Sequence, residues 1–235
     1  SYYDAVDFDR AGINIHPEPG SSVNLDTDGS YEYGYISGAV SVVDVDSDGD
    51  SDVIYFPVTV SYDPSSGVSD IADPGHTWFY KAVIDTSDLD NPEWCEFVDP
   101  YDYVVARQEV YYASTTAWHA DGSLGVYWGT GSPYDRLNSD PGYVFGFIDE
   151  SPTSCPTTAT PICTGGYLEM DEGEGLTGNP IAYQGVVYFP TYTPNEDRCE
   201  NGLGKIRGMS YNTCEGGIDT NGDGQANAEY VETDG

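Results

Sequence analysis

The chain has 235 residues and carries 41 acidic against 7 basic side chains, which gives it a formal net charge of −34. This charge excludes nucleic acid as a partner, because binding a phosphate backbone needs clustered Lys and Arg, and it excludes anionic membrane surfaces for the same reason. No apolar run approaches the ~20 residues that span a bilayer, so membrane insertion is not expected. The chain starts at Ser1 without a signal-peptide pattern, and we expect a processed chain or a fragment.

The acidity does not indicate disorder, because the chain is rich in aromatic residues. It contains 21 Tyr, 7 Phe and 4 Trp, far more than an unfolded acidic tail holds. Together with 28 Gly, 15 Pro and runs of Val, Ile, Tyr and Thr, this composition predicts an all-β protein with many turns. Such an excess of like charge costs stability unless a salty environment or bound divalent cations offset it.

Residues 1–34 are an acidic N-terminal segment, which we interpret as an incomplete repeat unit ahead of the repeats in residues 35–235. Within it, residues 24–32 place Asn24, Asp26 and Asp28 around Gly29. This pattern fits a cation-binding loop only in part. It is either a third calcium loop or an acidic turn.

Three β-like units follow one another along residues 35–235. Each contains an apolar and aromatic strand that ends in Pro or Gly, namely Ile54–Pro57, Val126–Gly129 and Val187–Pro190. An apolar stretch precedes each strand, at Ala39–Val43, Val110–Trp118 and Ile181–Tyr183. A second strand follows each one after a polar loop, at Thr77–Asp85, Tyr143–Asp149 and Lys205–Tyr211.

This recurrence predicts a β-propeller portion built from about three to four four-stranded antiparallel blades. No stretch shows helical periodicity over helical length. A meander that recurs and cannot cover its own faces is the sequence form of a propeller blade, whereas the alternative is a β-sandwich whose strands are similar by chance. Because so few blades do not close a typical ring, we expect the rest of a longer protein or another chain to complete it.

The strongest chemical signal is residues 44–52, an acidic loop with Asp at every second position. Its Asp residues are Asp44, Asp46, Asp48, Asp50 and Asp52. Calcium takes 6–8 oxygen ligands at ~2.3–2.6 Å, and the side chains at loop positions 1, 3 and 5 converge on one point. Gly49 permits the sharp turn, Asp50 offers its backbone carbonyl, and Asp52 closes the shell. We therefore predict a Ca²⁺ loop, against the alternative of a solvated acidic turn. Tyr55 replaces the bidentate Glu of a helical EF-hand, so the loop runs into a strand.

A second loop, residues 219–227, has the same frame. Its residues at the alternate positions are Asp219, Asn221, Asp223, Gln225 and Asn227. Because Asn and Gln replace carboxylates at several positions, we predict that this loop also binds Ca²⁺, with a lower affinity than the first.

The cysteines indicate disulfide bonds in an exported protein. The chain has Cys95, Cys155, Cys163, Cys199 and Cys214, none of them in a C-x-x-C motif. The pairs closest in sequence are Cys155 with Cys163 and Cys199 with Cys214, and disulfides there suit an oxidising compartment. Cys95 is then left free or bonded to another chain. The alternative is an intracellular protein with buried thiols.

The sequence offers no ordered catalytic constellation. His16, His76 and His119 are isolated, and no H-E-x-x-H, G-x-S-x-G or phosphate loop occurs. We expect His76 and His119, which lie near Trp78 and Trp118 in the sequence, to pack on aromatic edges. With 41 carboxylates, chance acid and base pairs are certain. We expect a protein without catalysis. The alternatives are a propeller enzyme of the quinoprotein dehydrogenase or glycoside hydrolase type, or a calcium-dependent structural sheath or surface-layer component.

Four motifs in order resemble the PilY-type type IV pilus assembly factors and pilus tip adhesins, in the late part of their C-terminal β-propeller. These are the loop Asp44–Asp52 with Gly75–Lys81, then Val126–Ser132, then Tyr143–Asp149, and last Tyr188–Pro194 with Cys199 and Gly202–Gly204. The match extends over roughly residues 35–230. The family's calcium ligands would carry over to the five Asp residues of the first loop.

The resemblance implies an extracellular, pilus-associated protein that is exported through the periplasm. Its implied partners are pilus subunits (minor pilins) or the remainder of a longer adhesin, together with a surface or host ligand, and calcium would control pilus extension. Two features depart from the family pattern: residues 62–74 are an insertion, and no Arg-Gly-Asp tripeptide occurs. We therefore expect a role in tip assembly more than adhesion to a particular surface.

Overall fold

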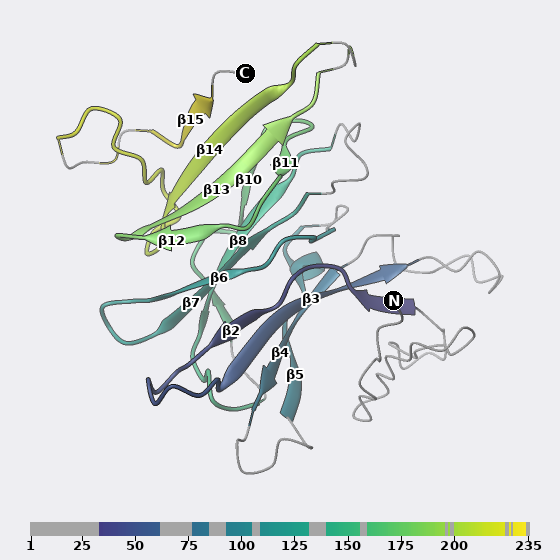
Figure 1. Cartoon of the computed structure of the whole chain (residues 1–235), viewed down its shortest axis with the longest axis vertical. Helices are drawn as coiled ribbons and strands as arrows, with labels where there is room; N and C mark the ends of the chain where they lie inside the picture. The colour runs from purple at the N-terminus through teal and green to yellow at the C-terminus, as the bar shows by residue number, and fades with distance from the viewer. Residues whose placement is uncertain are drawn as a thin grey trace.

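The computed structural model describes residues 33–61, 77–84, 93–104, 109–131, 140–155, 159–195, 197, 200–223, 226 and 228–233. Within these residues the chain forms three antiparallel β-sheets and one 3-10 helix, η1 (Pro100–Asp102). The sheets follow one another along the long axis of the molecule, with the first at the bottom and the third at the top of Figure 1. The all-β prediction is confirmed. No helix in the described part is long and apolar enough to cross a membrane.

Each sheet has five strands, four of which follow one another as hairpins. The first sheet contains β1 (Tyr33–Ile36), β2 (Ser41–Val43), β3 (Val53–Ser61), β4 (Thr77–Val83) and β5 (Glu93–Val98). The second contains β6 (Thr115–Trp118), β7 (Leu124–Gly129), β8 (Tyr143–Asp149), β9 (Ala159–Pro161) and β10 (Tyr167–Glu169). The third contains β11 (Gly175–Leu176), β12 (Ile181–Tyr183), β13 (Val186–Thr193), β14 (Leu203–Ser210) and β15 (Tyr230–Thr233).

The repeat found in the sequence is present in the register of the strands. The central pairs are β3 with β4, β7 with β8, and β13 with β14, which are the three predicted strand pairs. The tyrosine of each motif pairs with an equivalent position of the next strand, as Tyr55 with Lys81, Tyr127 with Gly146, and Tyr188 with Gly208. On the other side, β2, β6 and β12 pair with the same strands, so the three meanders share one topology.

Two apolar cores lie between the sheets. In the core between the first and second sheets, the ring of Trp128 stacks on Phe79 with centroids 4.2 Å apart, and Phe145 and Phe147 stack on the other parts of the indole. The core between the second and third sheets contains Tyr127, Val144, Leu176, Val187, Phe189 and Met209. The middle sheet is therefore buried on both faces, which explains why every residue of β7 is buried.

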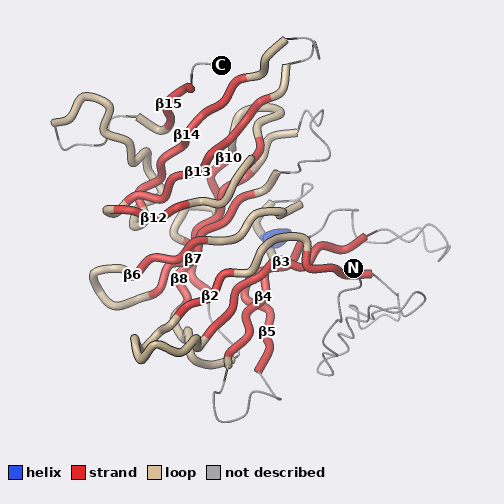
Figure 2. The backbone as a smooth tube through the Cα atoms, viewed as in Figure 1, coloured by secondary structure: helices blue, strands red, loops and turns tan. Residues whose placement is uncertain are grey.

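Strands β2, β6 and β12, one from each sheet, lie next to one another from bottom to top in Figure 2. Hydrogen bonds join their neighbourhoods: Ser41 Oγ donates to the carbonyl of Ser114 over 2.7 Å, and Ala113 N–H donates to Asn179 Oδ1 over 3.0 Å. The described residues form an open succession of sheets and no closed ring.

Two disulfide bonds join neighbouring sheets, and the predicted pairing is wrong. Cys95 of β5 is bonded to Cys155, which follows β8, and Cys163, which follows β9, is bonded to Cys214, which follows β14. The expected short-range pairs do not form, because Cys155, Cys163 and Cys214 are each bonded to a cysteine associated with a neighbouring sheet, and Cys95 is not left over. Cys199 lies outside the described residues. Disulfides of this kind are typical of an oxidising compartment, at the cell exterior or in the periplasm.

Replacing Cys95 and Cys155 together with Ser is expected to lower the free energy of unfolding by about 4 kcal/mol. The bond closes a loop with a sequence separation of 60 residues, and releasing a loop of that length restores this much chain entropy to the unfolded state. Denaturant unfolding of the wild type and the double variant measures the difference. An unchanged midpoint would show that the bond does not hold the first two sheets together.

Candidate functional site

The first acidic loop is the turn of the hairpin between β2 and β3, at the lower left of Figure 1. Val43 pairs with Val53, and the N–H of Asp52 donates to the carbonyl of Val43 over 3.0 Å. Residues 44–52 therefore span the distance between two paired strand residues. This closure fixes both ends of the loop on the first sheet.

Three of the predicted ligands lie together in this loop. Carboxylate oxygens of Asp44, Asp46 and Asp48 lie within 4.8 Å of one another. Two ligands of one calcium ion can lie up to about 5 Å apart, because each stands ~2.3–2.6 Å from the ion. The three carboxylates can thus share one cation. They are all oxygen donors, which is the donor set that calcium prefers.

The backbone of the loop is bent by two residues in the left-handed region. Ser47 has φ of 64° and Gly49 has φ of 100°, and Gly pays no steric cost at such a φ. Asp44 holds the bend from inside, accepting the N–H of Ser47 over 2.6 Å and that of Gly49 over 2.9 Å. The role of Gly49 in the sharp turn agrees with its predicted place in the loop.

The other two predicted ligands, Asp50 and Asp52, lie outside the group of three. Asp52 turns its carboxylate toward the start of the loop, where Oδ2 accepts the N–H of Val45 over 2.6 Å. The N–H of Asp50 donates to Asp48 Oδ1 over 2.9 Å. Asp52 is therefore placed to tie the two ends of the loop together.

Mutual repulsion is visible at the centre of the loop. The N–H of Asp48 by itself lowers the pKa of Asp46, but desolvation and the neighbouring carboxylates outweigh it, and the pKa is raised. Asp48, Asp52 and Asp44 supply that negative charge. A bound divalent cation would reverse the effect, because it stabilises the ionised form of every carboxylate around it.

The second loop has the same local structure. Ile218 pairs with Ala228, each accepting the other's N–H over 3.1 and 3.0 Å, so residues 219–227 again span a closed pair. Asp219 accepts the N–H of Gly222 over 2.7 Å, as Asp44 accepts that of Ser47. Gly222 has φ of 76°, which is the left-handed region that Ser47 occupies in the first loop.

The second loop offers a weaker donor set. Asn221 Oδ1 accepts the N–H of Asp223, and its Nδ2 donates to the Asp223 carboxylate over 3.1 Å. The Asn221 amide therefore already forms a hydrogen bond with a carboxylate that would have to bind the ion. Gln225 and Asn227, the other predicted ligands, lie outside the described residues, as do residues 24–32. Both loops lie on the left side of the molecule in Figure 1.

A buried ion pair between the first and second sheets was missed by the sequence analysis. Lys81 is fully buried, and its Nζ lies 2.9 Å from Asp149 Oδ2 and 2.7 Å from the carbonyl of Ser151. The Tyr55 hydroxyl donates to the same carboxylate oxygen over 2.6 Å. The only signal in the sequence is a Lys inside an apolar run of β4, where an unpaired charge would be costly.

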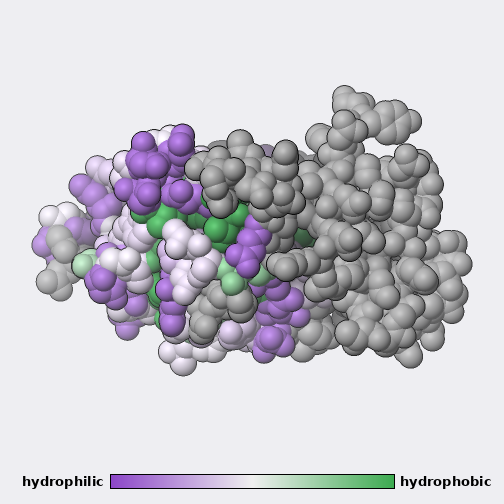
Figure 3. Space-filling model, turned by 90° about the horizontal axis from the view of Figure 1, so that it is seen from below, coloured by the Kyte–Doolittle hydropathy of each residue, from purple (hydrophilic) through white to green (hydrophobic). Residues whose placement is uncertain are grey.

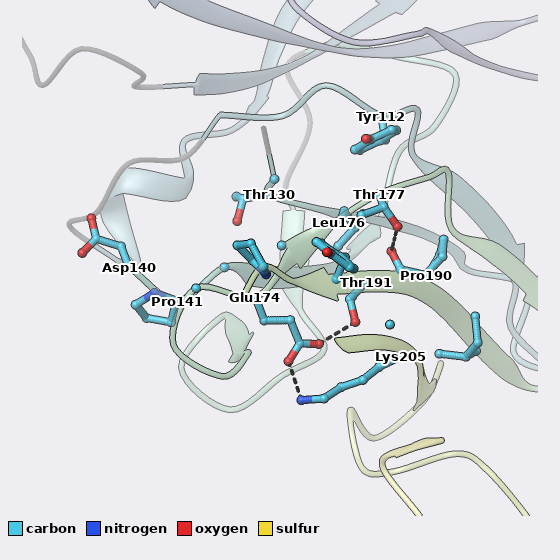
Figure 4. A pocket seen from close by; sticks show the side chains of 18 of the residues that line it. Tyr112, Thr130, Asp140, Pro141, Glu174, Leu176, Thr177, Pro190, Thr191 and Lys205 are labelled. Atoms are coloured by element: carbon cyan, nitrogen blue, oxygen red, sulfur yellow. Dashed lines mark hydrogen bonds and ion pairs between the residues drawn. The ribbon is translucent and has the colours of Figure 1, made fainter. Parts of the chain in front are cut away.

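A second charged cluster borders a cavity of about 450 Å³ between the second and third sheets. Figure 4 shows the Glu174 side chain at the cavity wall, bonded to Thr191 and Lys205. Arg207 binds both oxygens of the same carboxylate, over 2.6 and 2.7 Å. Burial alone would raise the pKa of Glu174, but the hydrogen bonds from Arg207, Thr191 and Lys205 outweigh it and lower the pKa to about 2.

The cluster is better suited to anchoring the fold than to binding a ligand. Its carboxylate is held by three donors, and Lys205 also contacts Asp171, which is mostly exposed. The ring of Tyr230 covers the cationic groups, 4.6 Å from Lys205 Nζ and 5.2 Å from Arg207 Cζ. The strongest charges of the cavity wall are thus already paired within the third sheet.

His119 also takes part in an internal network. Its Nε2 lies 2.7 Å from the Tyr127 hydroxyl, which donates to the carbonyl of Tyr211 over 2.8 Å. Burial lowers the pKa of His119. The histidine packs against the rings of Tyr127 and Tyr211. His16 and His76 lie outside the described residues.

Every Lys and Arg among the described residues is buried and paired with a carboxylate: Lys81, Lys205 and Arg207. The surface of the described part is therefore negative without compensating Lys or Arg. Seen from below, it is mainly hydrophilic, with a smaller apolar area between the hydrophilic side chains (Figure 3). This distribution concentrates the repulsion at the surface, where salt or bound cations can offset it.

Comparison of the chain with protein-family models, with curated proteins and with solved structures finds no match.

Proposed function

We propose that this protein binds calcium in its two hairpin loops and acts as a binding or assembly protein outside the cell, without catalysis. The observation that carries the proposal is the likeness of the two loops. Both place oxygen-bearing residues at positions 1, 3 and 5 between two residues whose backbones pair, which are strand residues in the first loop and an isolated bridge in the second. Both hold the fourth position in a left-handed conformation. A solvated acidic turn requires neither feature, whereas both features occur in both loops.

Asp44, Asp46 and Asp48 would hold the ion in the first loop, and Asp219, Asn221 and Asp223 would hold it in the second. A bound calcium ion would supply the positive charge that the surface lacks. It would thereby fix the hairpin ends of the first and third sheets.

For the place of action, we propose the late part of a propeller in a PilY-type pilus assembly factor. The motifs that resemble this family follow the order of the three sheets. The first loop joins β2 to β3, the next two motifs fall on β7 and β8, and the last begins on β13. The disulfides support an exported location. The open succession of three sheets is compatible with consecutive blades. A strain that lacks the protein should display fewer surface pili, and undiminished piliation would contradict this assignment.

Calcium binding is tested by unfolding with and without chelator. At a hundredfold excess over Kd, an ion that binds only the folded state adds about 2.7 kcal/mol to the free energy of unfolding. We expect calcium to stabilise the wild type by this order, and Asp48→Ala to lose the part due to the first loop. Asp121→Ala, in the exposed turn between β6 and β7, is the matched control and should respond like the wild type.

An equal response to calcium in the wild type and in a double Asp48→Ala, Asp223→Ala variant would contradict calcium binding at these loops. Sodium chloride at the same ionic strength separates site binding from screening, because screening acts on all surface carboxylates alike.

A further inference from the structure

The face of the third sheet that points away from the second sheet carries no charged residue. Strand register assigns to this outer face the side chains of Ile181, Tyr183, Val186, Tyr188, Pro190, Tyr192, Ile206 and Val231. The opposite face carries the charged cluster of Lys205 and Arg207. In a chain with a net charge of −34, an uncharged sheet face needs a physical reason.

Much of this outer face is exposed to solvent. The exposed fraction is 64% for Ile181, 62% for Tyr183 and 41% for Val231. Described residues contact this face at three places: Ile218 lies over Gly208, Gly178 lies beside Pro190, and the N–H of Gly202 donates to the Tyr192 hydroxyl over 2.9 Å. Soluble proteins rarely leave contiguous apolar surface of this kind without a binding partner.

The equivalent faces of the first two sheets are each covered by the next sheet. Tyr55 lies on such a face, and its hydroxyl donates to Asp149 at the end of β8, over 2.6 Å. Tyr127 lies on the next, and its hydroxyl donates to the carbonyl of Tyr211, directly after β14, over 2.8 Å. Each tyrosine therefore reaches the end of the corresponding strand in the following sheet.

Tyr188 occupies the third of these positions. It pairs with Gly208 as Tyr127 pairs with Gly146, and its hydroxyl makes no hydrogen bond to the described residues. The surroundings repeat as well: a Cβ added at Gly38 would lie 3.0 Å from Cγ of Pro57, and one added at Gly178 would lie 3.1 Å from Cγ of Pro190. The outer face thus repeats the face that receives the second sheet.

We propose that the outer face of the third sheet binds a further four-stranded antiparallel β-sheet that lies outside these 235 residues. That sheet would pack as the second packs on the first. It would present apolar side chains to Tyr188 and Pro190. It would also present a hydrogen-bond acceptor to the Tyr188 hydroxyl, at the end of the strand that corresponds to β8 and β14. The inference uses no property of the calcium loops.

A second copy of this chain does not fit the site. Two chains of net charge −34 repel each other strongly. A head-to-tail arrangement would need the free face of the first sheet, but there Phe56, Val58 and Tyr80 are already buried, with 3%, 1% and 8% of their surface exposed. A self-complementary arrangement would pack the outer face against itself, and on this face the described strands carry no carboxylate that could accept from the Tyr188 hydroxyl as Asp149 accepts from Tyr55.

Site-specific photo-cross-linking in the cells that make the protein tests the proposal. A benzophenone amino acid is placed at Ile181 or at Val231, on opposite edges of the outer face, and at Val42, an exposed residue of β2, as the control. Each of the first two positions should cross-link to the same further polypeptide. The residues of that polypeptide that carry the cross-link should be two apart in its sequence, as they are on one face of a β-strand. The benzophenone at Val42 should not cross-link to those residues.

The same cross-link measures the contribution of single side chains. Tyr188→Asp should lower its yield at Ile181 at least tenfold, because it buries a charge in the interface, whereas Val42→Asp should not. Tyr188→Phe should lower the yield about two- to tenfold, the value of one hydrogen bond. Cross-links to residues 1–235 of a second copy, or a yield no higher than at the control position, would overturn the proposal.

Discussion

Replacing Glu174 with Gln is expected to lower the free energy of unfolding by about 3 to 5 kcal/mol. The carboxylate is buried and is the common acceptor for Arg207, Lys205 and Thr191. Without its charge, two cationic groups remain buried in the third sheet and lose their main partner. Denaturant unfolding measures the loss. Asp171→Asn is the matched control, because it removes a 60% exposed carboxylate from the same cations and should cost less than about 1 kcal/mol.

The same residue predicts how stability changes in acid. The folded-state pKa of Glu174 is about 2, below the ~4.3 of a Glu in an unfolded chain. Its contribution is therefore fully present above pH 4.5 and is lost as the pH falls toward 2. The stability difference between the wild type and Glu174→Gln should shrink over this interval. A difference that stays constant from pH 6 to pH 2.5 would contradict the assigned role.

Replacing Trp128 with Ala is expected to destabilise the protein by about 3 to 5 kcal/mol. The indole is fully buried and stacks on Phe79, Phe145 and Phe147. Its removal leaves a large cavity between two sheets that cannot both move inward, because the second sheet is also packed against the third. Thermal or denaturant unfolding gives the loss.

Trp118→Ala provides the comparison, since Trp118 is 44% exposed at the end of β6 and its truncation should cost under about 1 kcal/mol. Similar losses for the two tryptophans would mean that the aromatic core is not the main stabilising contact between the first two sheets.

The central strands could be predicted from the sequence because their local pattern is strong. Each central pair combines an aromatic run that ends in Pro or Gly with a second apolar run, and burial on both faces of the middle sheet makes such runs nearly continuous. The apolar stretches expected before each pair contain β2, β6 and β12, whereas β1, β5, β9, β10, β11 and β15 were not predicted. β11 and β15 are short, and β15 is exposed along its length, so neither has the alternation that marks a half-buried strand.

The contacts between sheets could not be predicted, because they depend on residues far apart in the chain. The disulfides have sequence separations of 60 and 51 residues, whereas the prediction from the sequence paired the cysteines that are closest to each other along the chain. The pairing of Lys81 with Asp149 likewise appears only when the second sheet is placed on the first. The two loops are the opposite case, because their proposed ligands are close together in the sequence. The sequence could therefore point to the cluster of Asp44, Asp46 and Asp48, whose carboxylate oxygens lie within 4.8 Å of one another.

The distribution of charge links the fold to the proposed function. The described Lys and Arg residues pair with carboxylates inside the molecule, so they do not offset the negative charge of the surface. The negative charge on the surface of the described part can therefore be offset only by cations from the solution. Calcium loops at the first and third sheets would offset part of it, and the remainder favours a salty exterior.

Calcium titration by calorimetry tests calcium binding most directly. We expect two ions per wild-type chain, one ion for Asp48→Ala and for Asp223→Ala, and none for the double variant, with the first loop binding more tightly because it has more carboxylates. No heat of binding in the wild type, or an equal stoichiometry in the wild type and the double variant, would contradict calcium binding by these loops.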